Sequence, residues 1–301
     1  MRWLLLASTA IGLALLLAGP ARAGDAGHDR RFWIELRDSD FRVSAREALL
    51  PLALEAAQLL GSPDAELRDE VAYSALVSWV YRERRLSDEE LEPVRMMLVE
   101  NSRSGLGEVD TDSLFLRSFS VLGLSVFAAA DLKQPFLTSA EFHELVELGV
   151  QQLSREKDLR GYVPGKGWGH ATAHDADLLK FLARSPRLTQ VEQGRIVAAI
   201  AERLRSVDRV FIWGEDARLA AALLSLALRP DPDPGAFLSW TKRLAQEHAA
   251  LWAGKLDVAR YVSARAQLNA LGQLAADLEC TATGPCNDIR VALRELRAAT
   301  R

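Results

Sequence analysis

Apolar residues recur at helical spacing along nearly the whole 301-residue chain, and this pattern limits the possible folds more than any other feature of the sequence. No window alternates apolar and polar residues as an amphipathic strand would. The amphipathic stretches end at the Gly, Pro, Ser and Asp residues that begin and end helices. The sequence therefore predicts an all-α protein. Helices are expected at residues 46–60, 65–81, 87–100, 114–130, 138–154, 168–183, 189–207, 216–228, 234–253, 258–278 and 287–299.

The helix expected at 114–130 is apolar on nearly every side, so we predict that it lies buried at the centre of the fold. Arg117 is the exception, because a buried guanidinium group needs a carboxylate partner. Short connections between helices of this length make sequential helices antiparallel neighbours. We therefore predict a HEAT-like α-solenoid of antiparallel helix pairs, with a closed α/α toroid as the alternative.

The segment 1–23 has the organisation of a secretory signal peptide. A positively charged start precedes an apolar run at 4–18, and Ala21 and Ala23 form the A-x-A pattern that signal peptidase accepts. The apolar run is shorter than the ~20 residues that span a bilayer. We therefore expect cleavage before Gly24, no stable membrane insertion afterwards, and a single all-helical domain at 24–301. This predicts a periplasmic or secreted protein.

The only two cysteines, Cys280 and Cys286, flank a Gly-Pro turn near the end of the chain. In an oxidising compartment this spacing predicts a local disulfide between two helices. The formal net charge of −4 and the lack of any basic run argue against a nucleic-acid partner. The partner is expected to be a small ligand or another protein.

The densest group of glycines and polar residues lies at 158–177, with the sequence DLRGYVPGKGWGHATAHDAD. A loop rich in Gly and Pro here leads into a helix, which is how a rigid scaffold often presents a functional site. His170, His174 and Asp177 stand at i, i+4 and i+7, so we expect them on one stripe of that helix. We predict that this stripe faces a pocket rather than open solvent, and that the pocket holds Lys166, Arg117 or Asp216.

Three interpretations of this stripe remain open. A histidine pair at i and i+4 can bind a divalent metal, with Asp177 orienting His174 and a third ligand from Glu215 or Asp216. Zinc peptidases carry a Glu directly after the first His, however, and this chain has an alanine there. The same residues could instead bind a ligand without a metal, or form a buried polar seam between helices.

The loop before the histidines carries further candidates. Lys166 and the glycines beside it could bind an anion at the start of the helix. Trp168 could provide a stacking surface for a sugar or base, although an aromatic residue at a helix start more often serves packing. Asp158 and Arg160 flank Gly161 and are expected to pair and shape the turn.

Several of these segments together are similar to one bacterial family, domain-of-unknown-function family 2785. The resemblance extends from about Phe32 into the last helices. It implies an all-helical protein and no particular activity, and it suggests that Arg117, Arg160, Lys166, His170, His174, Asp177 and Asp216 belong to one site. The segments that carry it are LRDE at 67–70, RSF at 117–119, DLRGY at 158–162, KGWGHATAHDAD at 166–177 and EDAR at 215–218.

Two functions from different classes follow from the sequence. The first is a metal- or anion-binding site that could serve hydrolysis, built around the segment 158–177 of an exported helical-repeat protein. The second is a non-enzymatic scaffold that binds a protein or a peptidoglycan-associated partner, in which the His and Asp residues are purely structural.

Overall fold

The computed structural model describes residues 27–43 and 49–300, so the expected signal peptide at 1–23 lies outside the described residues. The prediction of an all-α protein is confirmed. The helices are α1 (Arg30–Asp38), α2 (Leu49–Leu59), η2 (Glu66–Tyr73), α3 (Ser74–Leu76), η3 (Val77–Arg82), α4 (Asp88–Asn101), α5 (Ser113–Lys133), α6 (Ser139–Arg155), α7 (Ala171–Ala183), α8 (Gln190–Ser206), α9 (Glu215–Ala227), α10 (Gly235–Leu251), α11 (Val258–Asp277) and α12 (Pro285–Ala299).

The structure differs from the predicted elements in three places. Helix α1 was not expected; Asp29 begins it by accepting a hydrogen bond from the Phe32 backbone, and Trp33 is buried beneath it. The helix expected at 65–81 is present, but its η2 and η3 parts are π-helical, a wide form often found at functional sites. Two short antiparallel strands, β1 (Tyr162–Val163) and β2 (Gly167–Trp168), form a small hairpin within the segment 158–177.

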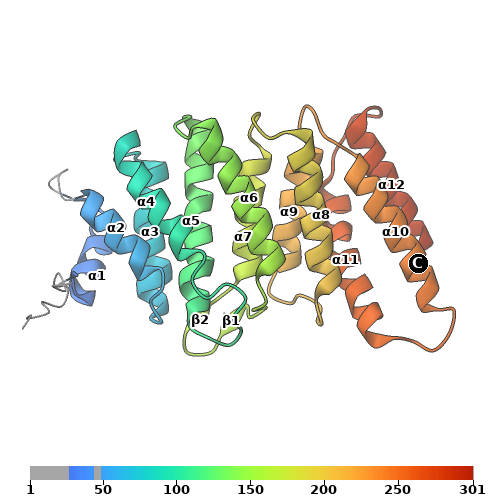
Figure 1. Cartoon of the computed structure of the whole chain (residues 1–301), viewed down its shortest axis with the longest axis horizontal. Coiled ribbons are helices and arrows are strands. Elements are labelled where there is room, and N and C mark those ends of the chain that lie inside the picture. Colours follow the sequence, from blue (N-terminus) through green and yellow to red (C-terminus); the bar gives the residue numbers. More distant parts are fainter. Residues whose placement is uncertain (1–26, 44–48, 301) are drawn as a thin grey trace, which may run out of the picture.

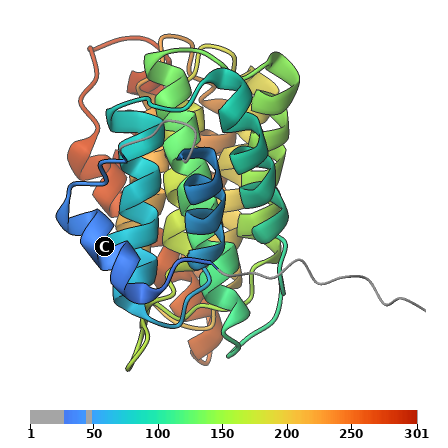
Figure 2. The same cartoon turned by 90° about the vertical axis from the view of Figure 1, so that its left-hand side faces the viewer.

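The helices pack in two layers that run along the long axis of the molecule (Figure 1). Helices α5, α7, α9 and α11 are neighbours in one layer, which we call the inner layer and which η2 and η3 extend. Helices α4, α6, α8 and α10 lie in the other layer. A view from the end with α1 shows the helices standing nearly parallel to one another (Figure 2). Helices α1 and α12 lie at opposite ends of the row (Figure 1).

Because sequential helices are antiparallel, their connections fall on two opposite edges of the row (Figure 1). We call one the cap edge. Its connections are uniformly short and lie at 83–87, 134–138, 184–189, 228–234 and 278–284. We call the other the hairpin edge, because it contains β1 and β2. Its connections lie at 60–65, 102–112, 156–170, 207–214 and 252–257, and those at 102–112 and 156–170 are longer than any at the cap edge.

Regular helix starts distinguish the cap edge. Helices α4, α6 and α8 each begin with a reciprocal capping box, in which Ser87, Thr138 and Thr189 exchange hydrogen bonds with a glutamate three residues later. These three capping residues are evenly spaced along the sequence. The Cys280–Cys286 disulfide also lies at this edge, with 5.9 Å between the Cα atoms, as predicted.

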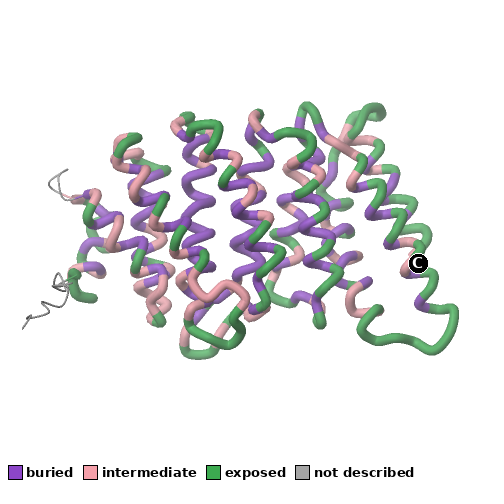
Figure 3. The backbone as a smooth tube through the Cα atoms, in the orientation of Figure 1, coloured by how far each residue is buried: buried purple, intermediate pink, exposed green. Residues whose placement is uncertain are grey.

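Helix α5 is the central buried element, which confirms the prediction made for 114–130. It is the one helix among the described residues that is long and apolar enough to cross a membrane, yet 78% of its most apolar window is buried inside the protein. Buried positions run along α5 and the facing sides of its neighbours (Figure 3). The buried Arg117 pairs with Glu156, and the predicted carboxylate partner is therefore present.

Candidate functional site

Three glycines allow the loop 156–170 to fit tightly between helices. A Cβ atom at Gly161 would lie 2.2 Å from Trp213 Cδ1, and one at Gly169 would lie 2.5 Å from a Leu114 methyl group. At Gly167, φ is +79° and a Cβ atom would lie 2.7 Å from the Cβ of Ala65. Only glycine permits these approaches. The glycines of the segment therefore serve close packing of the hairpin against η2, α5 and the loop 207–214.

Lys166 does not occupy the position expected for an anion site at a helix start. It lies in the hairpin turn, and its Nζ donates to both carboxylate oxygens of Asp112 at 2.8 and 2.7 Å. Helix α7 begins only at Ala171, after β2, so the expected helix start at Trp168 was too early. The hairpin, which no alternation in the sequence signalled, separates the glycine turn from the helix.

Buried ion pairs hold the base of the loop. Arg117 Nε and Nη2 donate to the two Glu156 oxygens at 2.5 and 3.0 Å, and the Glu156 carboxylate also accepts backbone N–H groups at the start of the loop. Asp158 is buried and accepts from Arg160 Nε at 2.9 Å, so the expected pairing of these two residues is confirmed. Asp158 also accepts from the Asp110 backbone at 3.0 Å, which joins two connections of the hairpin edge.

Arg68 supplies a further support that the residue pattern alone did not reveal. It is fully buried, and its Nη2 donates to the Lys166 carbonyl at 2.6 Å. Its guanidinium carbon lies 4.2 Å from the centre of the Phe115 ring, a cation–π distance. Only the resemblance of residues 67–70 pointed to this position. Arg68 ties η2 to a hairpin that lies far along the sequence.

The two histidines have different environments. His170 precedes α7 with a left-handed φ of 53°. It is therefore not on a helical stripe with His174, contrary to the prediction. Its Nε2 donates to the Trp213 carbonyl at 3.1 Å, which leaves Nδ1 as an acceptor. His174 is buried, and its Nδ1 lies 2.7 Å from Ser118 Oγ. Because the Ser118 hydroxyl donates to the Gly169 carbonyl at 2.5 Å, we assign the His174 proton to Nδ1.

Both imidazoles are held neutral. Burial lowers the pKa of His170, and the positive charge of Arg218 lowers it further. Burial places the pKa of His174 well below its ordinary value, with smaller contributions from His170 and Arg218. Desolvation disfavours the charged form of a histidine. The two rings are in edge contact, with 5.8 Å between their centres.

Asp177 does not orient His174, which corrects the sequence interpretation. Its carboxylate accepts from Lys180 Nζ at 2.6 Å and from Arg218 on the neighbouring helix α9. Ser118 takes the orienting role instead. Helix α5 contributes this serine, and the sequence placed it only beside Arg117, with no sign of its partner.

Glu215 and Asp216 begin α9 but differ in their surroundings. Glu215 is buried, its Oε2 accepts from the Trp213 backbone at 3.0 Å, and its Oε1 lies 3.9 Å from His170 Nε2. Burial raises the pKa of the Glu215 carboxyl. Asp216 accepts from the Ala217 backbone. No described contact joins Asp216, Lys166 or Arg117 to His170 or His174, so none of these three residues forms the expected pocket beside the histidines.

A divalent metal would find two neutral histidine nitrogens here, Nδ1 of His170 and Nε2 of His174. Structural and catalytic metal sites usually need three or four protein ligands. Within the part of the chain that the structure describes, no three His, Cys, Asp or Glu residues are gathered in a way that could hold a metal ion. The donor set is therefore incomplete for a resident metal, and we derive no chemistry through one.

The π-helical segment contributes two groups that the sequence did not identify. Burial raises the pKa of Asp69 to about 6, despite the opposing charge of Arg68. Burial also raises the pKa of the Tyr73 hydroxyl, and the negative charge of Asp177 on α7 adds to this effect. Residues from η2, α7 and α9 thus influence one another electrostatically. We call Tyr73, His170, Asp177 and Arg218 the inner-face site.

The aromatic residues of the hairpin lie at one end of this site. Trp168 stacks on His170 with 4.9 Å between ring centres, and Trp213 and Tyr162 meet Trp168 edge-on. All three aromatic residues remain partly exposed. Trp168 therefore fits both interpretations made from the sequence, because it packs against His170 and still presents ring surface to solvent.

A family model described as "Protein of unknown function (DUF2785)" matches residues 103–272 of the chain. The chain belongs to this family. No curated protein matches the chain, and no solved structure does. The DUF2785 match begins before α5 and ends within α11, so it contains every site residue expected from the sequence between Arg117 and Asp216, whereas Asp69 and Tyr73 lie before it.

Within the region that matches DUF2785, the structure places the expected site residues in two groups. His170, Asp177 and Glu215 meet near Arg218, at the junction of α7 and α9. The second group supports the hairpin through ion pairs and hydrogen bonds inside the loop or beneath it. Its members are Arg117, Asp158, Arg160, Lys166 and His174. The single site that the resemblance suggested is therefore divided into one group beside Arg218, whose side chain is about half exposed, and a second group that supports the hairpin.

Proposed function

We propose that this DUF2785 protein is an exported HEAT-like α-solenoid that binds a small anionic ligand at the inner-face site. The supporting observation is that segments distant in sequence bring Tyr73, His170 and Glu215, whose pKa values are shifted by burial, close to Asp177 and Arg218. Active sites are where burial and neighbouring charges shift pKa values in this way, so such a cluster is a candidate functional site.

The arrangement of the helices supports a solenoid rather than a toroid. Three capping boxes recur at an even spacing along the sequence, as expected for a structural repeat. The first and last described helices lie at opposite ends of the row, whereas a toroid would bring them together (Figure 1). In repeat proteins the longer insertions gather at the binding side, and here they gather at the hairpin edge.

The charges of the inner-face site suit an anion. Arg218 and Lys180 share the single carboxylate of Asp177, which leaves one positive charge in excess, and the Arg218 side chain is about half exposed. Neutral His170 offers Nδ1 as a proton acceptor. These groups are the ones that metal-free hydrolysis of a bound ester or phosphoester would use.

Export is proposed from the signal-like residues 1–23 and agrees with the disulfide at Cys280 and Cys286, because disulfides persist in oxidising compartments. Mass spectrometry of the exported protein tests this. A chain that begins at Gly24 and lacks free thiols is expected. A chain that retains residues 1–23 would contradict export by cleavage.

Arg218 provides the test of anion binding. Inorganic phosphate at millimolar concentration should raise the melting temperature of the protein, because a ligand that binds only the folded state stabilises it. Arg218→Gln should abolish the increase. The matched control is Arg195→Gln, since both arginine side chains are about half exposed (49% and 47%) and both pair with one carboxylate. Equal increases in all three proteins would reject the inner-face site.

A second function, an interaction scaffold for a protein or a peptidoglycan-associated partner, is favoured by a different observation. The buried supports Arg117, Asp158 and His174 direct their hydrogen bonds into the protein itself. A seam of this kind needs no ligand to satisfy it. The scaffold proposal predicts no phosphate-dependent stabilisation, so the same experiment separates the two functions.

A further inference from the structure

The tryptophans of the described chain divide into two classes. Trp33, Trp79 and Trp240 are almost completely buried, as large aromatic residues in a core should be. Trp168, Trp213 and Trp252 are exposed, and all three belong to connections of the hairpin edge. Exposed tryptophan is costly to keep in water and tends to mark a surface that meets something else.

Aliphatic residues accompany the exposed tryptophans in two clusters. Ile212 lies beside Trp213 and is 77% exposed; Leu256 and Val258 lie just after Trp252 and are also exposed. The two clusters occupy the connections 207–214 and 252–257 and the first residue of α11. Both connections join helices of the two layers at the same edge. Because the helices stand nearly parallel, their ends at this edge lie at a similar level (Figure 1).

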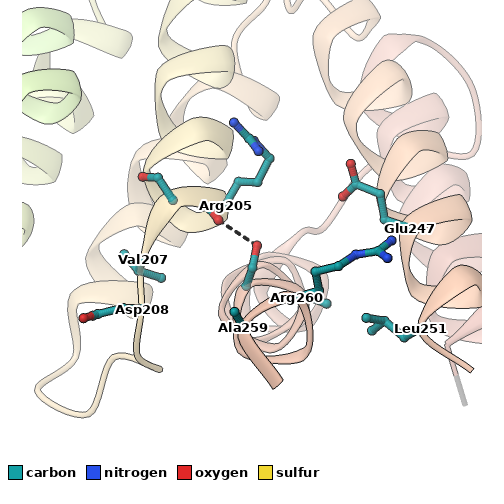
Figure 4. A pocket seen from close by; sticks show the side chains of 10 residues that line it. Arg205, Val207, Asp208, Glu247, Leu251, Ala259 and Arg260 are labelled. Atoms are coloured by element: carbon teal, nitrogen blue, oxygen red, sulfur yellow. Dashed lines mark hydrogen bonds between the residues drawn. The ribbon is translucent and has the colours of Figure 1, made fainter. Parts of the chain in front are cut away.

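A hollow of about 420 Å³ lies at the helix ends from which the two connections lead (Figure 4). The end of α8, the first turns of α11 and the last turns of α10 enclose it, and Ser263 donates to the Arg205 carbonyl across one side at 2.7 Å. Arg205, Arg260 and Glu247 line it (Figure 4). The loops beside this hollow are apolar, and its lining carries charges of both signs. A phospholipid likewise joins apolar acyl chains to a zwitterionic headgroup, so the two surfaces complement each other.

Charged residues of both signs lie at the hairpin edge, and several of them pair with one another. Arg209 pairs with Asp208, and Lys166 pairs with Asp112. The edge therefore offers no excess of either sign that would attract a strongly charged partner. Tryptophan prefers the boundary between headgroups and acyl chains, because its ring is apolar and its N–H group is polar.

We propose that the hairpin edge docks reversibly on a membrane of zwitterionic phospholipids, with the two clusters entering the boundary between headgroups and acyl chains. A row of loops at one level can meet a plane at several points at once. Docking of this kind involves only the outer part of the bilayer and no spanning segment.

The test uses protein that begins at Gly24, because the apolar run at 4–18 would itself bind lipid. Partitioning onto phosphatidylcholine vesicles is measured by co-sedimentation and by the blue shift of tryptophan fluorescence. We expect binding that is unchanged in high salt. The double variant Ile212→Ser/Val258→Ser should bind about tenfold more weakly or worse, because each substitution removes an apolar side chain from the boundary.

The double variant Val191→Ser/Leu228→Ser is the matched control. Val191 is 75% exposed and Leu228 is also exposed, but both lie at the cap edge. This control should bind like the parent protein. Failure of the parent to bind the vesicles, equal loss in both variants, binding that requires anionic lipid and disappears in salt, or association of two copies through this edge without vesicles would each overturn the proposal.

Discussion

The cap edge and the hairpin edge join the same helices but are built in different ways. At the cap edge, Ser87, Thr138 and Thr189 bond to glutamates three residues later, and the connections are short. At the hairpin edge, α5, α7 and α9 begin without a side-chain cap, and the connections before α5 and α7 are much longer. The order of the hairpin edge comes instead from contacts between residues distant in sequence, such as Arg68 with Lys166.

This difference suggests that the cap edge serves mainly to stabilise the helices and that the hairpin edge presents the functional surface. A helix cap is local and contributes about 1 kcal/mol each time it occurs. Irregular loops stay in place only when buried partners compensate their backbone groups. The buried pairs beneath the hairpin edge, Arg117 with Glu156 and Asp158 with Arg160, provide that compensation. The hairpin edge, whose connections differ more in length, is therefore the edge that depends on buried charged groups, which are costly to keep. This is expected for a functional surface.

Breaking the buried ion pair should have the largest effect. Arg117→Met leaves the Glu156 carboxylate buried without its cation, so the free energy of unfolding should fall by about 3–5 kcal/mol. The cap edge offers a control in Arg229, which is also buried and donates to the Ala183 and Ser185 carbonyls, but whose acidic partner Asp231 is exposed. Arg229→Met should therefore cost less, about 1–3 kcal/mol.

Urea denaturation of both variants measures this comparison. Equal losses of stability would mean that the two edges depend on buried charge to the same degree, and the distinction between them would fail.

The two histidines should respond differently to truncation. His174→Ala removes a buried ring and leaves the Ser118 oxygen without the N–H group that donates to it, so we expect a loss of about 2–3 kcal/mol. His170→Ala should cost less than about 1 kcal/mol, because this residue is less buried and bonds only to the Trp213 carbonyl. Thermal melts of both variants measure the difference. Marked destabilisation by both would place His170 in the structural seam as well.

The Asp69 carboxyl should make stability depend on pH. Its pKa rises from 3.8 to about 6 on folding, so between pH 4 and 6 the folded state holds more protons than the unfolded state. The free energy of unfolding should therefore fall as the pH rises through this window and then level off. Two pKa units correspond to about 3 kcal/mol, and the 28% exposure of the side chain reduces the expected fall to about 1–2 kcal/mol.

Asp69→Asn tests this pH dependence. The variant should be about 1–2 kcal/mol more stable than the parent at pH 7 and similar to it at pH 4, because it cannot ionise. Denaturant unfolding at both pH values is the measurement. A gain that is the same at both pH values would show that Asp69 ionisation is not its source.

The smallest effect is expected at the cap edge. Thr189→Ala removes one capping hydrogen bond at the start of α8 and should cost about 1 kcal/mol. Because the cap is local, the phosphate-dependent stabilisation assigned to Arg218 should remain unchanged. Melting curves with and without phosphate measure both. A change in phosphate response would show that the two edges are coupled through α8.

The fold was more predictable from the sequence than the site. The buried α5 and the carboxylate partner of Arg117 followed from one apolar helix with a single charge. The pairing of His170, His174 and Asp177 on one stripe did not hold, because the β1–β2 hairpin delays the start of α7 and turns His170 out of the helix. Helical periodicity cannot reveal a turn that depends on glycines pressed against distant residues.

The sequence by itself determined the helices, the cap edge and the clustering of candidate residues at 158–177, because these depend on propensities and spacings within about one helical turn. Only the tertiary structure decided that Ser118 orients His174, that Arg218 holds Asp177, and that Tyr73 joins the inner-face site. The partners in the first two pairs come from different helices and lie many turns apart along the chain. Packing between helices chooses such partners, and no local pattern in the sequence records that choice.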